Sequence, residues 1–183
     1  MVRRTHMHSL RLGVLGACAA LAPLATSVAA CSSSSSSSTT SNVSGNYTVD
    51  ITNGNNGCSM GNWTAGAMSS GIPVTVTQSG AQVTATVNGV TGAFMTLGIG
   101  TNTFSGSLAG DQASMTASGT VQGTQGSCTF TTDATVDATF SGDTMQGTVT
   151  YTRVPANGSS GCAAIQGCKS VQSFSGARPP SGD

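Results

Sequence analysis

The sequence has few charged side chains and lacks the residues on which most catalytic sites depend. Only 7% of its residues are charged, against roughly a quarter in an ordinary soluble domain. It has no glutamate, and its two histidines are His6 and His8. The rest of the chain therefore cannot form Ser-His-Asp or Cys-His nucleophilic arrangements. We expect a protein that is not an enzyme and has no cofactor.

The chain also lacks a basic cluster. Beyond residue 30 it has three basic side chains and six acidic ones, a net charge of −3: Arg153, Lys169 and Arg178 against Asp50, Asp111, Asp133, Asp137, Asp143 and Asp183. Nucleic-acid binding depends on neutralising phosphates, so we expect no nucleic-acid partner. Asp133 and Asp137 share one face of a strand, about 13 Å apart, and look like solvent-facing side chains rather than a catalytic pair.

The N-terminal segment has the features of a secretory signal peptide. Arg3, Arg4 and Arg11 form a basic start, and residues 12–30 are uncharged and end in small residues. A retained transmembrane anchor is the alternative, but Pro23 interrupts the apolar stretch and many of its residues are small. We expect residues 1–30 to be removed.

The end of this segment, Val28-Ala29-Ala30-Cys31, resembles the lipobox of bacterial lipoprotein precursors. The resemblance implies that Cys31 carries a diacylglycerol and begins the mature chain, usually with a further acyl group on its N-terminus, so the partner is a membrane. Resemblance to Gram-negative lipoproteins with serine rather than aspartate after the cysteine implies, through Ser32, the outer membrane of the cell envelope. Two alternatives remain: a lipobox ending at Cys18, and ordinary cleavage after Ala30 that leaves Cys31 as a thiol.

The remainder divides into a tether, a domain and a short tail. Residues 31–43 contain the lipidated cysteine and a Ser/Thr-rich run, which cannot bury apolar surface and predicts a flexible tether. Residues 44–176 show strand-like alternation, and residues 177–183 form the tail.

The domain is predicted to be all-β. Apolar residues alternate with threonine at 74–77, 83–87 and 128–140, and short turns such as Ser79-Gly80 and Asn88-Gly89 separate the runs. Trp63 is expected on a second strand, and no helix is expected after residue 44. The core is thin, with Leu97 and Leu108 as its only inward leucines.

About eight or nine antiparallel strands joined by hairpins predict an up-and-down meander. Such a meander hides its edges by closing into a barrel or by folding into a sandwich. The near-uniform hairpins favour a small closed barrel, with a β-sandwich as the alternative.

Four cysteines follow Cys31: Cys58, Cys128, Cys162 and Cys168. An even number in an exported chain predicts two disulfides. Of three pairings we favour Cys162–Cys168 as a local clip and Cys58–Cys128 as a link from the first long loop to a strand. A metal site is not expected, because the chain has no CxxC spacing and no histidine near these cysteines.

Two features suggest a ligand. Asn53, Asn55, Asn56 and Asn62 surround Trp63 in the sequence, which would suit a glycan, although a turn with a core tryptophan is the simpler interpretation. A barrel interior lined by small residues would suit a small apolar ligand.

The lipobox, the serine tether, the opening Asn46-Tyr47-Thr48-Val49 and the final Phe174-Ser175-Gly176-Ala177-Arg178-Pro179-Pro180 resemble a group of uncharacterised bacterial outer-membrane lipoproteins, lipocalin-like (calycin-like) in outline. The resemblance implies a barrel but no ligand. We expect a non-enzymatic, membrane-anchored module with a structural or interaction role. The alternatives are a lipocalin-like carrier of a small apolar ligand or lipid, and a carbohydrate-binding surface module.

Overall fold

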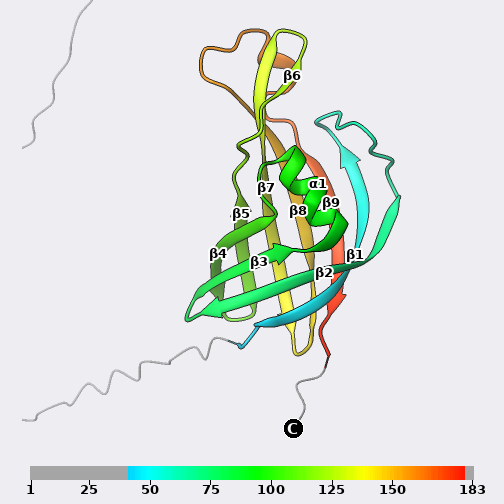
Figure 1. Cartoon of the computed structure of the whole chain (residues 1–183), viewed down its shortest axis with the longest axis vertical. Coiled ribbons are helices and arrows are strands. Elements are labelled where there is room, and N and C mark those ends of the chain that lie inside the picture. Colours follow the sequence, from blue (N-terminus) through cyan, green and yellow to red (C-terminus); the bar gives the residue numbers. More distant parts are fainter. Residues whose placement is uncertain (1–40, 180–183) are drawn as a thin grey trace, which may run out of the picture. The chain divides into compact units, whose positions relative to one another are not determined.

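The computed structural model describes residues 41–179 and contains nine strands, one α-helix and one short 3-10 helix (Figure 1). In chain order these are β1 (Gly45–Asn56), β2 (Met68–Ser79), β3 (Gln82–Val87), α1 (Gly89–Gly98), β4 (Thr103–Ala109), β5 (Gln112–Ala117), β6 (Gly123–Gln125), β7 (Cys128–Ser141), β8 (Thr144–Pro155), η1 (Cys162–Ala164) and β9 (Ser170–Ala177). The all-β prediction is confirmed.

Eight of these strands form a closed antiparallel barrel. The strands β1 to β5 pair in chain order, β5 pairs with β7, and β9 lies between β8 and β1. The short strand β6 pairs with the start of β7 and extends beyond the barrel wall. Because the first and last strands of the meander pair with each other, neither is left as an open edge. The predicted up-and-down barrel is confirmed.

The barrel core is built by alternation of inward and outward side chains, which is clearest along β3, β5 and β7. In β7 alternate residues from Cys128 to Phe140 are buried, while Asp137 on the opposite parity is exposed. The long strand predicted over 128–140 is therefore correct, and it runs through the barrel wall into the β6 hairpin. Most inward side chains are Val, Ala, Met and Phe, which are small enough for eight strands to close around them.

Tight turns containing glycine join the two strands of several hairpins. Gly80 between β2 and β3 and Gly142 between β7 and β8 have φ of 60° and 57°, values that favour glycine. The predicted Ser79-Gly80 turn is confirmed. The predicted hairpin turn at Asn88-Gly89 is wrong, because this dipeptide begins a helix. The chain pairs with β3 again only after that helix, through β4.

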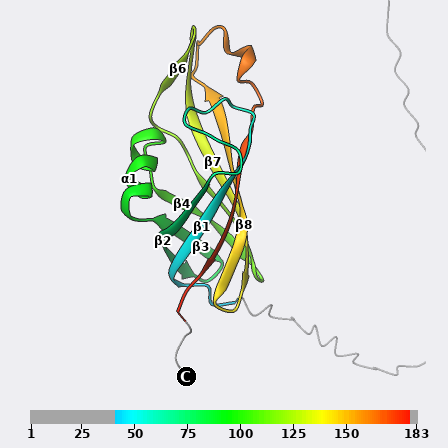
Figure 2. The same cartoon turned by 90° about the vertical axis from the view of Figure 1, so that its right-hand side faces the viewer.

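Helix α1 was not expected from the sequence. It follows β3, contacts β2 and β3, and lies beside the barrel mouth, with Met95 packed against the core (Figure 2). Gly92 allows the close approach, because a Cβ at this position would lie 2.1 Å from the Val87 carbonyl oxygen. Leu97 belongs to this helix and is exposed, so its predicted inward position is wrong, whereas Leu108 is buried as expected.

The two disulfides join Cys58 to Cys168 and Cys128 to Cys162. All four cysteines are paired, but the favoured pairing was wrong. Backbone pairing explains the difference: the end of β1 lies beside β9, which brings Cys58 next to Cys168, and η1 packs against the start of β7. Both bonds lie at the end of the barrel near β6.

The opposite end is closed by Arg178, directly after β9. Its guanidinium forms an ion pair with Asp143 at 2.9 Å and donates to the carbonyl oxygens of Ser44 and Asn42. It also lies over the ring of Tyr47, 5.7 Å from the ring centre. One side chain thus joins the first described residues, the β7–β8 turn and the last strand.

Candidate functional site: the barrel mouth and helix α1

The barrel interior contains a cavity of about 60 Å³ lined only by apolar side chains. Its wall comes from all eight barrel strands and includes Val49, Val74, Val136, Phe140, Met145 and Phe174. Pockets for drug-sized ligands usually measure about 300–1,000 Å³. The core is therefore largely filled by its own side chains.

A second hollow of about 140 Å³ lies at the barrel mouth beneath α1. It shares Ile51, Val87, Phe104 and Val149 with the inner cavity, so the two spaces adjoin. Met95 on the inner side of α1 helps to line it. A small apolar molecule entering the barrel would pass this helix.

One side of the mouth is polar, and three of its side chains form a chain of hydrogen bonds. The Tyr151 hydroxyl donates to Gln172 Oε1 at 2.9 Å, and Gln172 Nε2 donates to Asn53 Oδ1 at 2.7 Å. Asn53 Nδ2 in turn donates to the carbonyl oxygen of Thr64. Burial raises the pKa of Tyr151 to about 12, so its hydroxyl is a proton donor at neutral pH and not a base. Sequence reasoning missed Tyr151 and Gln172 because their contact depends on the β8–β9 register.

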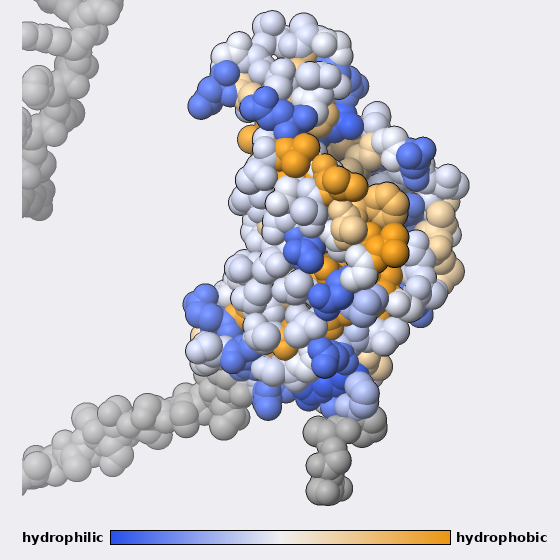
Figure 3. Space-filling view, in the orientation of Figure 1, coloured by the Kyte–Doolittle hydropathy of each residue, from blue (hydrophilic) through white to orange (hydrophobic). Residues whose placement is uncertain are grey.

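The outer side of α1 presents three large apolar residues to solvent. Val90, Phe94 and Leu97 are 73%, 68% and 72% exposed. Their spacing of four and three residues places them on one face of the helix. Figure 3 shows hydrophobic residues gathered over the part of the molecule where α1 lies in Figure 1. We call these three residues the α1 apolar face.

Trp63 lies in the loop between β1 and β2, so its expected place on a strand is wrong. Its indole N–H donates to the Gly54 carbonyl oxygen at 3.0 Å, and its ring meets the Tyr151 ring edge-on at 6.0 Å. The neighbouring Asn56 side chain bonds with Met60 and Ser170.

These contacts fold the Trp63 loop back towards the barrel mouth. Asn55 and Asn62 are exposed, and Asn62 has a φ of 57°. The indole donor and the Asn56 amide, by contrast, are occupied within the protein. Binding of a glycan by this loop remains a prediction, and no contact described here favours it.

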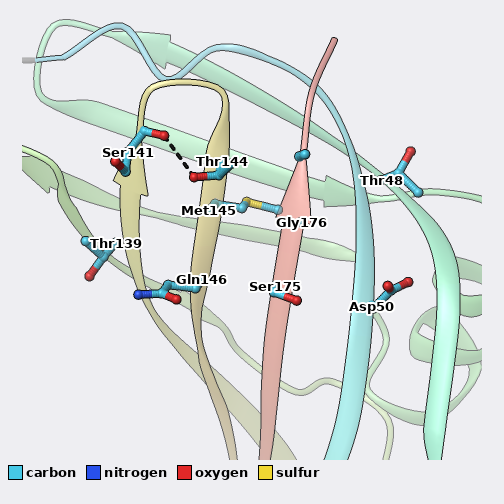
Figure 4. A pocket seen from close by; sticks show the side chains of 10 residues that line it. Thr48, Asp50, Thr139, Ser141, Thr144, Met145, Gln146, Ser175 and Gly176 are labelled. Carbon is cyan, nitrogen blue, oxygen red and sulfur yellow. Dashed lines mark hydrogen bonds between the residues drawn. The ribbon is translucent and has the colours of Figure 1, made fainter. Parts of the chain in front are cut away.

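A larger but shallow hollow of about 450 Å³ lies on the outer wall, across β1, β9, β8 and β7 (Figure 4). Most of its side chains are hydroxyls or amides, such as Thr139, Gln146 and Ser175. Its one carboxylate, Asp50, accepts the Gly71 backbone N–H at 2.9 Å. Such a surface offers neutral hydrogen-bonding groups without an acid–base pair.

The lipidation site expected at Cys31 lies outside the described residues, as do the signal peptide and most of the tether. Within residues 41–179, no group of three or more His, Cys, Asp or Glu side chains is arranged to hold a metal ion. The helices found in this same stretch are too short or too polar to cross a bilayer.

Comparisons of this chain with protein-family models, with curated protein sequences and with solved structures found no match.

Proposed function

We propose that this chain is a non-enzymatic lipoprotein, anchored through Cys31, whose barrel acts by contact with another component of the bacterial envelope. The lipobox resemblance supports the anchor, and Ser32 supports the outer membrane as its location. The lipocalin-like outline suggested by the sequence is consistent with the eight-stranded closed barrel.

The acidic side chains support a non-catalytic role, because several already have structural partners. Asp50 accepts the Gly71 N–H, Asp133 accepts the Gly119 N–H at 2.8 Å, and Asp143 pairs with Arg178. A general acid or base must be free to exchange a proton with a substrate. These three carboxylates instead hold loops and chain ends in place.

The observation that carries the interaction role is the α1 apolar face. Three large apolar side chains on one short helix are not covered by any described part of the chain. Burying a side chain of this size stabilises a protein by about 1.5–3 kcal/mol. Exposed groups of this kind mark contact surfaces more often than isolated apolar residues do.

Native mass spectrometry of the lipoprotein, extracted gently from its own membrane, tests the proposal. We expect a mature chain that begins at Cys31 with added acyl mass and no stoichiometric small-molecule passenger. An unmodified Cys31 would contradict the anchor and make this an ordinary secreted protein.

A second candidate, a carrier of a small apolar ligand, is favoured by the apolar inner cavity that adjoins the barrel mouth. Octanol, titrated into the protein and followed by calorimetry, should then bind saturably. Ala85→Leu, which adds volume to the cavity wall, should abolish this binding, whereas Thr148→Leu on the outer face should not. Equal binding by both variants, or no saturation, would exclude the carrier function.

A further inference from the structure

The charges of the barrel are segregated on one side of it. The stretch 51–110, which includes all of β2, β3, α1 and β4, contains no charged residue. The eight charged residues of the described chain all lie on or beside other elements: Asp50, Asp111, Asp133, Asp137, Asp143, Arg153, Lys169 and Arg178. Since β2, β3 and β4 are neighbours in the barrel, one continuous wall is uncharged, and α1 packs on it.

The α1 apolar face projects from this uncharged wall. Side chains around it, such as Thr91 and Thr96, are neutral, and Val121 lies near the end of α1, where its backbone N–H donates to the Ile99 carbonyl oxygen. The described residues carry a net charge of −2, and no charged residue belongs to β2, β3, α1 or β4; the Asp50 carboxylate on β1 reaches the wall only at the Gly71 N–H of β2.

We propose that the uncharged wall rests on the bilayer that carries the anchor, with Val90, Phe94 and Leu97 inserted at the boundary between headgroups and acyl chains. Short apolar helix faces bind lipid surfaces in this way, in proportion to the apolar area they bury. The inference extends the proposed function by identifying the partner as lipid.

The position of the anchor allows this contact. The chain enters the barrel at the end opposite α1, where the Ser41 N–H donates to the Gly110 carbonyl oxygen in the β4–β5 turn. The residues from Cys31 to Ser41 span at most about 35 Å when extended, and a six-residue strand such as β3 is about 20 Å long. The barrel can therefore lie on its side against the membrane.

Anchoring also makes lipid a better occupant than a second copy of the chain. An anchored domain meets its own membrane at a high effective concentration, so a small contact is sufficient. A stable dimer usually buries about 800 Å² on each partner, far more than three side chains supply. The small area and the missing charge therefore both favour lipid.

Depth-dependent fluorescence quenching tests the proposal on the mature lipoprotein in phosphatidylcholine vesicles. Leu97→Cys carries an environment-sensitive fluorophore, and Thr148→Cys on the exposed outer face of β8 is the matched control. The four barrel cysteines are paired, so the introduced thiol takes the label. With brominated acyl chains we expect about threefold quenching at position 97 and little at position 148. Adding Phe94→Asp to the Leu97→Cys protein should remove the quenching.

Two outcomes overturn the proposal. Absence of quenching at position 97 in anchored protein means that α1 does not touch lipid. Self-quenching between labelled copies, without lipid quenching, identifies a second copy as the occupant. The intact mass of the same sample reports the anchor separately. If Cys31 is unmodified, its free thiol would also take the label, so the test is repeated on the Cys31→Ser, Leu97→Cys protein at high lipid concentration: quenching there supports the α1 contact, and its absence excludes it.

Discussion

At the scale of single residues, the barrel mouth depends on one buried phenol. Tyr151 connects β8 to Gln172 on β9 through its hydroxyl and supports the Trp63 ring with its edge. Burial raises its pKa to about 12, compared with about 10 in an unfolded chain. The folded protein therefore holds this proton more tightly than the unfolded chain does.

Replacing Tyr151 with phenylalanine should make the protein less sensitive to alkali. The stability linked to the neutral phenol is complete below pH 10 and is lost as the pH rises towards 12, by about 3 kcal/mol in total. Urea unfolding at pH 8, 10 and 11, followed by Trp63 fluorescence, measures this loss. Tyr47, whose pKa burial also raises, is present in both proteins, so the difference isolates Tyr151. Parallel pH profiles would contradict the assignment.

Arg178 has the corresponding position at the other end of the barrel. Its side chain is largely buried and contacts Asp143, Tyr47 and the carbonyl oxygens of Ser44 and Asn42. Arg178→Ala should lower the free energy of unfolding by about 2 kcal/mol, because these acceptors lose their donor. Lys169→Ala, at an exposed residue, should stay within about 0.5 kcal/mol. Equal effects of the two substitutions in urea unfolding would show that the Arg178 contacts do not stabilise the barrel.

At the scale of elements, α1 has weak local support. It contains Gly89, Gly92 and Gly98, and the Asn88 side chain makes no capping hydrogen bond. Its position depends instead on Gly92, which fits against the Val87 carbonyl oxygen, and on Asn102, which donates to that same oxygen at 2.8 Å.

Gly92→Ala should therefore destabilise the protein although alanine is the better helix former. The added Cβ would force α1 away from β3, and we expect a loss of about 2 kcal/mol or more. Gly98 has no atom within 4 Å of an added Cβ, so Gly98→Ala should be neutral or stabilising by up to about 1 kcal/mol. Thermal unfolding of both variants measures the contrast. A gain in stability from both would mean that α1 is not held against Val87.

The strands were predictable and the helix was not, for a physical reason. Alternation at 83–87 and 128–140 shows directly which side chains face a core, and the near-uniform hairpins favoured a barrel over a sandwich. The apolar spacing at Val90, Phe94 and Leu97 was also present, but it describes a face that points outward. The glycines around it lowered the helix propensity. This spacing was the indication that the sequence offered of the α1 apolar face.

At the scale of the whole molecule, the disulfides and Arg178 stabilise opposite ends. The Cys58–Cys168 and Cys128–Cys162 bonds span 110 and 34 residues. Which cysteines meet depends on the register of β1 with β9 and on where η1 packs, and neither is encoded locally. For this reason the number of disulfides could be predicted from the sequence, but not their pairing.

The two bonds should differ in their contribution to stability. Loop-closure entropy predicts a loss of about 5 kcal/mol for the Cys58→Ala, Cys168→Ala protein and about 4 kcal/mol for the Cys128→Ala, Cys162→Ala protein. Urea unfolding of the two double variants beside the parent protein gives both values. The reverse order would show that the shorter bond stabilises native contacts beyond its effect on the unfolded chain.

The Cys58–Cys168 bond also determines how the protein responds to mechanical force. A pull between residues 41 and 179 would extend an uncrosslinked chain to about 480 Å. The bond bypasses 110 residues, so only the segments before Cys58 and after Cys168 can peel away from the barrel. The distance between residues 41 and 179 can then grow to about 100 Å. Under tension between its two ends the protein would yield by this short distance and then stop, with most of the barrel wall carrying no load.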